Sequence, residues 1–353
     1  MKVFLTTIIL LSLNINYLCA QINPERIDSV INNYFENSKF NGNALVTKNG
    51  EIIYNNSFGF SNFEWDIKNK PDTKFAIGSC TKQFTAALIM ILKQENKLSL
   101  GDNISKYIPE YPADKGNVIT IHNLLSHTSG IPEYFGLPQM GTLINNENNP
   151  NEFIKIFWDL ELEFEPGSQL RYSNSGFFLL GVIIEKVTGL SYETALREYI
   201  FNPLQMNNSG ILKDGEILKN KAYGYIKGKD TLSVAPYFNP SGAFSAGAIY
   251  SNVEDLLKWQ NSIFSNSILS KESIEKMLTV NFSRYGYGFG ILEKTLENGD
   301  KITLFGHEGQ FFGFRALIHF IKEDNSSIIL LDNNQNITLF KISSDIRKIV
   351  YEK

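Results

Sequence analysis

The chain has 353 residues, of which 43% are hydrophobic and 13% aromatic, so its composition predicts a folded protein with a sizeable core rather than a disordered chain. Lys and Arg number 33 against 37 Asp and Glu, which gives a net charge of −4 at pH 7. The chain has no long run of one sign and so lacks the electrostatic footprint of a nucleic-acid or membrane-surface protein. We exclude both as partners.

Residues 1–20 have the pattern of a secretory signal peptide. Lys2 supplies a basic start, residues 3–13 form an apolar run, and Ala20 is a small residue at the expected cleavage point. The run is too short to span a bilayer permanently, so we expect an exported protein, periplasmic or extracellular, without stable membrane insertion. Cys19 raises the alternative of a lipoprotein, but the residues before it do not suit a lipidation signal.

Once residues 1–20 are removed, Cys80 is the only cysteine left. An internal disulfide and a cysteine-based metal site are then excluded, and we interpret Cys80 as a small buried residue. His122 and His127 have no third ligand at metal spacing, so we expect no metal and no cofactor.

The strand patterns lie at both ends of the chain. A helical pattern follows Pro24, and Asn49-Gly50 joins two strand patterns in a hairpin, because two-residue turns prefer this pair. Helical spacing then runs over residues 79–97, and helix and loop continue to about residue 235. Strand patterns return beyond Tyr285 and are followed by a closing helix.

This order of elements predicts an α/β protein whose antiparallel sheet is assembled from both ends of the chain and flanked by helices. We expect residues 21–85 and 240–353 to form a discontinuous α/β domain, and residues 86–239 to form a mostly helical domain. A site built from distant segments would then lie in the cleft between the two.

Ser79 and Lys82 lie three residues apart, so they share a face of the predicted helix. A serine at the positive end of a helix, with an amine within reach of its proton, suits a nucleophile. The alternative is a polar cap on an apolar helix. Ser273 and Lys276 repeat the same spacing on a predicted surface helix, which shows how weak the motif is when it stands alone.

Two further segments distinguish Ser79 from Ser273. "RYSNSGFFLLG" places Tyr172 and Asn174 at the start of a predicted helix, and "GHEGQFFGF" contains His307 beside two glycines. "YSN" also recurs at residues 250–252, but there Ser251 and Glu254 are interpreted as a capping box of an ordinary amphipathic helix.

Taken in order, "SCTK", "LLSHTSGIPEYF", "YSN", "HEG" and "SGAFSAGAIYSNVEDLLKW" make the chain resemble the serine β-lactamase-related hydrolases. The likeness covers nearly the whole chain beyond residue 20. Within these hydrolases, the chain resembles the group of class C β-lactamases, D-alanyl-D-alanine carboxypeptidases, D-aminopeptidases and esterases. The resemblance implies a β-lactamase/DD-peptidase-like fold.

The resemblance also implies roles for the motif residues. Ser79 becomes the acylated nucleophile, Lys82 its proton acceptor or electrostatic support, and Tyr172 a general base or acid. For Lys82 to accept a proton near neutral pH, its pKa must fall by roughly 3 units. Burial or a second cation can do this, and we expect His307 to supply or modulate such a field. Which of Lys82 and Tyr172 is the base in each step stays open.

Substrate contacts are implied for the same segments. Asn174 would hold the substrate amide and Lys82, and His307 stands where class C β-lactamases have a lysine. Gly309 and Gln310 continue this third motif. The backbone N–H groups of Ser79 and Gln310 would form an oxyanion hole, worth about 3 kcal/mol per donor.

Glu308 stands where class C β-lactamases have a threonine that helps to hold a substrate carboxylate. A Glu308 side chain in the pocket would repel that carboxylate. Arg315 is interpreted as an exposed strand residue, with compensation for Glu308 as the alternative.

We therefore expect an exported serine hydrolase that forms an acyl-enzyme on Ser79 and cleaves short esters or D-amino-acid peptides. A small-molecule or peptide substrate is the only partner expected. The alternatives are a slow-deacylating penicillin-binding or sensor-type protein, and a β-lactamase.

Overall fold

The computed structural model describes residues 23–228, 231–296, 299–335 and 339–351. The predicted signal peptide and Cys19 lie outside the described residues. Within these ranges no single helix is long and apolar enough to cross a membrane, although α8 (Asn174–Thr188) and the segment Tyr192–Phe201, bent by 81°, reach that length and composition together.

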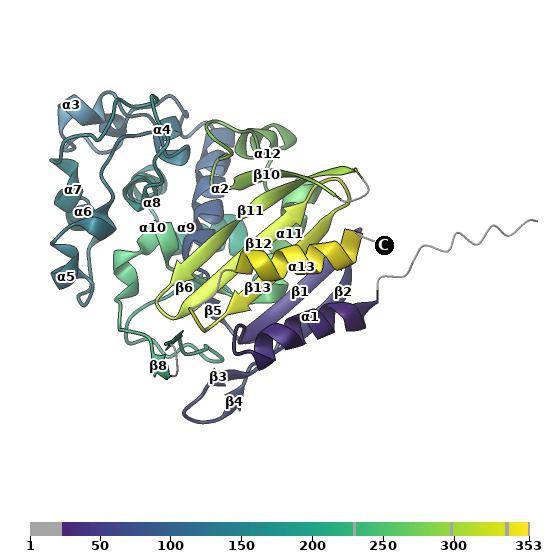
Figure 1. Ribbon diagram of the computed structural model, residues 1–353. Coiled ribbons are helices and arrows are strands. Elements are labelled where there is room, and N and C mark those ends of the chain that lie inside the picture. The colour runs from purple at the N-terminus through teal and green to yellow at the C-terminus, as the bar shows by residue number, and fades with distance from the viewer. Residues whose placement is uncertain (1–22, 229–230, 297–298, 336–338, 352–353) are drawn as a thin grey trace, which may run out of the picture.

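A six-stranded antiparallel sheet forms the centre of the molecule, with strand order β10-β11-β12-β13-β1-β2 (Figure 1). Strand β1 from the N-terminal part pairs with β13 from the C-terminal part, and in this pairing Ala44 lies opposite Leu330. The sheet is therefore assembled from both ends of the chain, as the sequence predicted. Its strands are β1 (Gly42–Lys48), β2 (Glu51–Ser57), β10 (Gly290–Thr295), β11 (Lys301–Phe311), β12 (Phe314–Ile321) and β13 (Ser326–Asp332).

The hairpin predicted at Asn49-Gly50 is present between β1 and β2. Both turn residues have positive φ, 52° at Asn49 and 81° at Gly50. Two-residue turns of this kind match the twist of the flanking strands, and asparagine and glycine adopt positive φ at low cost. The local sequence therefore sets the pairing next to the turn, and the register shifts further along, between Val46 and Thr47.

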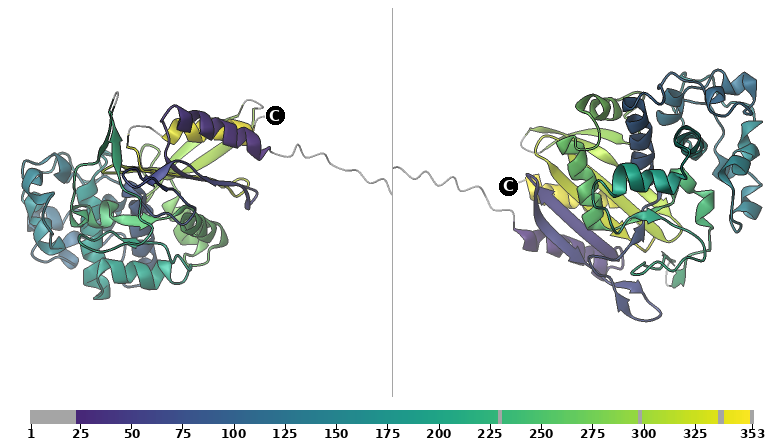
Figure 2. Two further views of the ribbon diagram at one scale, coloured as in Figure 1. Left: turned by 90° about the horizontal axis from the view of Figure 1, so that it is seen from below. Right: turned by 180° about the vertical axis from the view of Figure 1, so that it is seen from behind.

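Helices cover both faces of the sheet (Figure 2). Helices α1 (Pro24–Glu36) and α13 (Leu339–Tyr351) pack on one face, where Leu317 and Leu330 belong to their core. Ile318 and Ile329 point to the opposite face and join the larger core around α2 (Thr81–Gln94) and α11 (Val253–Ser265). This alternation follows from the two-residue period of a strand and decides which side chains can reach α2.

The remaining helices lie mainly on the side of the molecule beyond α2 (Figure 1). Helix α8 is the long element of this part, and it is buried from Ser175 to Ile184. The shorter helices are α3 (Ala113–Gly116), α4 (Ile121–Leu125), α5 (Met140–Leu143), α6 (Pro150–Phe153), α7 (Lys155–Trp158), α9 (Tyr192–Leu196), α10 (Phe244–Gly247) and α12 (Lys271–Met277). Short strands are β3 (Phe60–Asn62), β4 (Ile67–Lys68), β5 (Phe75–Ala76), β6 (Gly210–Ile211), β7 (Tyr225–Lys227), β8 (Leu232–Val234) and β9 (Ile249–Ser251).

Two details differ from the expectations. The helical segment predicted over residues 79–97 is a 3-10 turn, Gly78–Cys80, followed by α2, which ends at Gln94. The expected capping box of Ser251 and Glu254 is wrong, because α11 begins one residue later than predicted. The N-cap of α11 is Asn252, whose side chain accepts from the Asp255 N–H. The division into two domains stays a prediction, and its first boundary falls within α2.

Candidate active site

Ser79 lies in the 3-10 turn that connects β5 to α2. Neither this turn nor α2 has a side-chain cap hydrogen bond, so the interpretation of Ser79 as a helix cap is wrong. The turn presses against β11. Gly78 has a φ of +51°, and a Cβ there would stand only 2.4 Å from the Gln310 carbonyl oxygen. Glycine is required at this contact, which brings the backbones of Ser79 and Gln310 to one pocket.

Lys82 is fully buried one turn after Ser79. Its Nζ lies 3.1 Å from Ser79 Oγ and donates to Asn174 Oδ1 at 2.7 Å and to the Ala246 carbonyl at 2.8 Å. Burial lowers the pKa of Lys82 to about 7, while the charge of Glu133 acts in the opposite direction. A large fraction of Lys82 is therefore neutral near pH 7 and able to accept a proton.

Asn174 opens α8 directly after the N-cap Ser173. Its side chain binds Lys82, and its backbone N–H donates to Glu133 Oε2 at 2.6 Å. An acidic side chain at the N-terminus of a helix stabilises the unpaired amides there. Glu133 thus fixes the start of α8, and with it the amide that contacts Lys82.

Tyr172 lies over the same cluster, with Lys82 Nζ 4.8 Å from the centre of its ring. Burial of the phenol raises the pKa of Tyr172 well above its usual 10, and a hydrogen bond with the Ser79 side chain acts in the opposite direction. Tyr172 is therefore protonated at neutral pH, although 38% of the residue is exposed. At rest Tyr172 therefore keeps its proton, while much of Lys82 is neutral.

His127 holds the backbone on both sides of Tyr172. Its carbonyl accepts from the Arg171 N–H at 2.9 Å, and its Nδ1 accepts from the Ser173 N–H at 3.1 Å. The ring lies 4.4 Å from the Tyr172 ring, centre to centre. Burial lowers the pKa of His127 well below 6.5, so the ring is neutral and its Nδ1 stays an acceptor.

His307 lies on β11, and its ring centre is 5.9 Å from that of Tyr172. Its Nδ1 donates to the Glu308 carbonyl at 2.6 Å, so its Nε2 accepts from the Tyr285 hydroxyl at 3.0 Å. Burial and the charge of Lys82 lower the pKa of His307 to about 4. A neutral His307 supplies no cationic field, contrary to expectation. Burial, the other cause expected from the sequence, lowers the pKa of Lys82.

Glu308 points to the other face of the sheet. It lies opposite Leu317, in the core of α1 and α13, whereas His307 lies opposite Ile318. Its Oε1 accepts from Arg315 Nη1 at 3.1 Å, and the Leu339 N–H at the start of α13 also binds the carboxylate. The expectation that Glu308 repels a substrate carboxylate in the pocket does not fit this geometry.

Gly309 and Arg315 both make contacts that support the fold around β11. A Cβ at Gly309 would stand 1.8 Å from the Ile77 carbonyl oxygen, so this glycine permits the contact between β11 and the turn that carries Ser79. Arg315 is not an exposed strand residue, because it pairs with Glu308 and its Nε donates to the Gln335 carbonyl at 2.9 Å.

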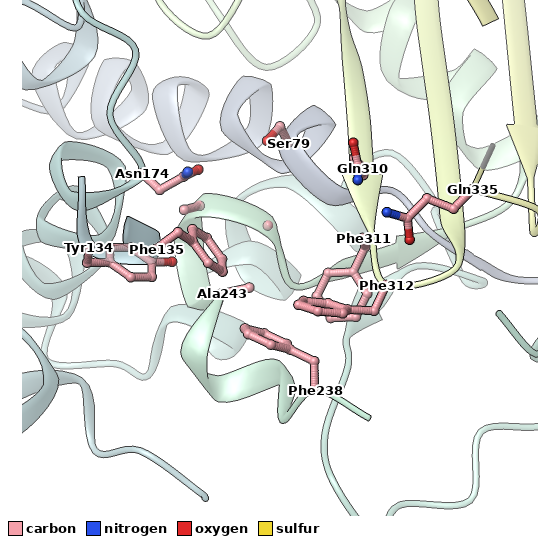
Figure 3. A pocket seen from close by; sticks show the side chains of 12 residues that line it. Ser79, Tyr134, Phe135, Asn174, Phe238, Ala243, Gln310, Phe311, Phe312 and Gln335 are labelled. Carbon is pink, nitrogen blue, oxygen red and sulfur yellow. The ribbon is translucent and has the colours of Figure 1, made fainter. Parts of the chain in front are cut away.

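A pocket of about 320 Å³ opens over Ser79 (Figure 3). Ser79, Asn174 and Gln310 line one side, and aromatic rings line much of the rest. The structure therefore brings together Ser79, Lys82, Tyr172, Asn174, His307 and Gln310 of the predicted site residues, and it leaves Glu308 outside.

Sequence reasoning missed four residues that hold this cluster. Ala246 offers a backbone carbonyl, which no side-chain pattern reveals. Glu133 and His127 belong to "SHTSGIPEYF", and an acidic residue in this segment was the only available signal, because the φ of +58° at His127 is seen only in the structure. Tyr285, the partner of His307, had no signal beyond its aromatic ring.

The antiparallel sheet between two sets of helices, with this cluster at the N-terminal end of α2, defines the architecture of serine β-lactamases and DD-peptidases. The family model described as Beta-lactamase matches residues 27–340. The chain is 33% identical over 327 residues to the protein PbpX of Bacillus subtilis (strain 168), covering 90% of this chain and 78% of that protein.

Two solved structures are similar over most of the chain. The penicillin binding protein from Bacillus halodurans has a TM-score of 0.81 and 26% identity, covering 92% of this chain and 98% of that one. The octameric penicillin-binding protein homologue from Pyrococcus abyssi has a TM-score of 0.81 and 33% identity, covering 93% of this chain and 77% of that one.

The chain belongs to the beta-lactamase family. The resemblance and the fold class predicted from the sequence are confirmed, and the protein is a hydrolase of the serine β-lactamase fold.

Proposed function

We propose that the protein is an exported serine hydrolase that cleaves esters or amides through an acyl-enzyme on Ser79. The observation that carries this proposal is the buried Lys82, with Nζ 3.1 Å from Ser79 Oγ and a pKa of about 7. A neutral amine at this position can take the serine proton near pH 7.

In the first step Ser79 Oγ gives its proton to Lys82 and bonds to the substrate carbonyl carbon. The N–H groups of Ser79 and Gln310 stabilise the negative charge on the carbonyl oxygen. The bond to the leaving group then breaks, the leaving group takes a proton from Tyr172, and Tyr172 recovers a proton from Lys82. The enzyme is left acylated, with Lys82 neutral.

In the second step water attacks the acyl carbon and gives up a proton to Lys82. The bond to Ser79 Oγ breaks, and Oγ takes a proton from Tyr172, which Lys82 protonates in turn. His307, through its contact with the Tyr172 ring, and Asn174, through Lys82, hold the proton carriers in place. Each cycle consumes one water and returns every group to its starting state.

Among substrates we propose short esters and D-amino-acid peptides, with β-lactams as a lesser class. The proposal of export rests on the signal-peptide pattern of residues 1–20. Penicillin-binding names among the relatives favour a second candidate, a protein that acylates and releases the acyl group slowly.

Covalent labelling tests the nucleophile. The protein is treated with a fluorophosphonate or a fluorescent penicillin, and the adduct is located by mass spectrometry. We expect one adduct, on Ser79, that is lost in Ser79→Ala and kept in Ser273→Ala. An adduct on Ser126, Ser273 or Cys80 would contradict the proposal.

Burst kinetics separates the two candidates. A hydrolase releases many equivalents of p-nitrophenol from p-nitrophenyl acetate per protein, whereas a slow-deacylating protein releases one equivalent and stops.

A further inference from the structure

The pocket over Ser79 has an aromatic wall made by segments far apart in the chain. Phe238 stacks on Phe312 with ring centres 4.3 Å apart and planes 13° apart, and Phe311 meets Phe238 edge-on at 5.6 Å. Phe135 continues the wall, with its ring centre 5.9 Å from that of Phe238. Figure 3 shows these rings on one side of the opening and Ser79 on the other.

The pocket is also neutral. Among the described residues that line it, the polar side chains are uncharged: Ser79, Tyr134, Asn174, Gln310 and Gln335. Tyr134 donates to the Gly242 carbonyl, and burial raises its pKa well above 10.

Two cations that bind residues of this lining, Arg315 and Lys82, also have other partners. Arg315 Nε donates to the Gln335 carbonyl behind the wall, and its Nη1 pairs with Glu308. Lys82 is fully buried and bound by Asn174 and Ala246. A substrate carboxylate in the pocket would therefore lose its hydration without gaining a cation.

The position of the proton donor decides which part of the substrate enters the pocket. The described lining includes neither Tyr172 nor His307, whose rings lie against each other. Since Tyr172 protonates the leaving group in the proposed function, the leaving group lies on that side. The acyl group then extends from Ser79 toward Phe238 and Phe312.

We propose that this pocket selects an uncharged acyl group that carries an aromatic ring or an apolar group of similar breadth. The inference rests on the proposed acyl-enzyme at Ser79 and deepens it. A volume of about 320 Å³ is at the small end for ligand pockets, so one ring with a short linker fills it. Aromatic rings favour stacked or edge-on partners, which the wall of phenylalanines offers.

Three esters with one leaving group test this selection: p-nitrophenyl acetate, p-nitrophenyl phenylacetate and the mono-p-nitrophenyl ester of succinate. Each kcat/KM is divided by the rate of uncatalysed hydrolysis, so that chemical reactivity cancels. We expect the phenylacetate to exceed both others by at least about tenfold, since each tenfold corresponds to about 1.4 kcal/mol.

Variants of the wall locate the effect. Phe238→Ala and Phe312→Ala should each lower the ratio of phenylacetate to acetate by about tenfold. Phe340→Ala, an exposed phenylalanine on α13, is the matched control and should keep the wild-type ratio. Phe135→Arg adds a cation at an exposed position of the lining and should raise the ratio of succinate to acetate.

The outcomes distinguish this inference from the function beneath it. Ser79-dependent turnover with equal normalised rates for the three esters, or wall variants that match Phe340→Ala, overturn the inference alone. If turnover of every ester persists in Ser79→Ala, the proposed function is wrong as well. If a thermal melt shows that Phe238→Ala does not fold, the ratio of phenylacetate to acetate turnover in Phe312→Ala, on the β11–β12 turn, decides the question.

Discussion

A serine followed three residues later by a lysine occurs at two places in this chain, and the two pairs have opposite surroundings. At the start of α2, Ser79 is partly exposed to a pocket and Lys82 is fully buried. On α12, Ser273 is fully buried, its N–H donates to Ser270 Oγ, and Lys276 is exposed. The comparison teaches that the spacing supplies only proximity. In the proposed mechanism, burial of the amine and access to the hydroxyl are what distinguish the first pair from the second.

The largest loss of activity is expected when Lys82 is replaced by a residue that stays cationic. Arginine in the Lys82→Arg variant remains protonated at every accessible pH, so it cannot take the serine proton. We expect kcat/KM for p-nitrophenyl acetate to fall by about 10³-fold, the range for loss of a general base. Lys276→Arg is the matched change at the second copy and should leave kcat/KM unchanged. Equal effects of the two substitutions would remove the distinction between the sites.

A smaller effect is expected at His127, which acts on Tyr172 through the backbone. His127→Leu removes the acceptor of the Ser173 N–H, and we expect kcat to fall about tenfold with little change in KM, because Tyr172 shifts. His127→Asn is the conservative control, since asparagine tolerates the positive φ and its Oδ1 can accept the same N–H. If His127→Asn loses as much activity as His127→Leu, the backbone contact is not the cause.

The smallest effect concerns Glu308, on the far face of β11. Glu308→Thr removes the pair with Arg315 and the contact with α13, so we expect a loss of about 1 kcal/mol in unfolding free energy. The ratio of succinate to acetate turnover should not change. Urea denaturation and the ester assay measure the two quantities. A higher relative rate for the succinate ester would restore the electrostatic role that the sequence suggested.

The fold was accessible from the sequence because its signals are local. Asn49-Gly50 set the first hairpin, and the strand patterns beyond Tyr285 identified the second half of the sheet. The motif segments around Ser79, Tyr172 and His307 also come together as expected.

Other features depend on side-chain direction and on distant contacts, which a single sequence does not fix. Glu308 follows His307 in the chain, and only the register of β11 with β12 shows that the two point to opposite faces. The aromatic wall joins Phe238 to the turn after β11, and the carbonyl that holds Lys82 belongs to Ala246. Such contacts between segments far apart in the chain become visible only in the folded protein.

The pH dependence of acylation tests the role of burial most directly. Burial lowers the pKa of Lys82 from 10.5 to about 7, so the neutral, proton-accepting form is lost as pH falls below 7 and predominates above it. We predict that kcat/KM for p-nitrophenyl acetate in the wild-type protein rises about tenfold per pH unit below 7 and levels off above it. A rate that is independent of pH between 5 and 9, or an inflection near 10, would contradict the account.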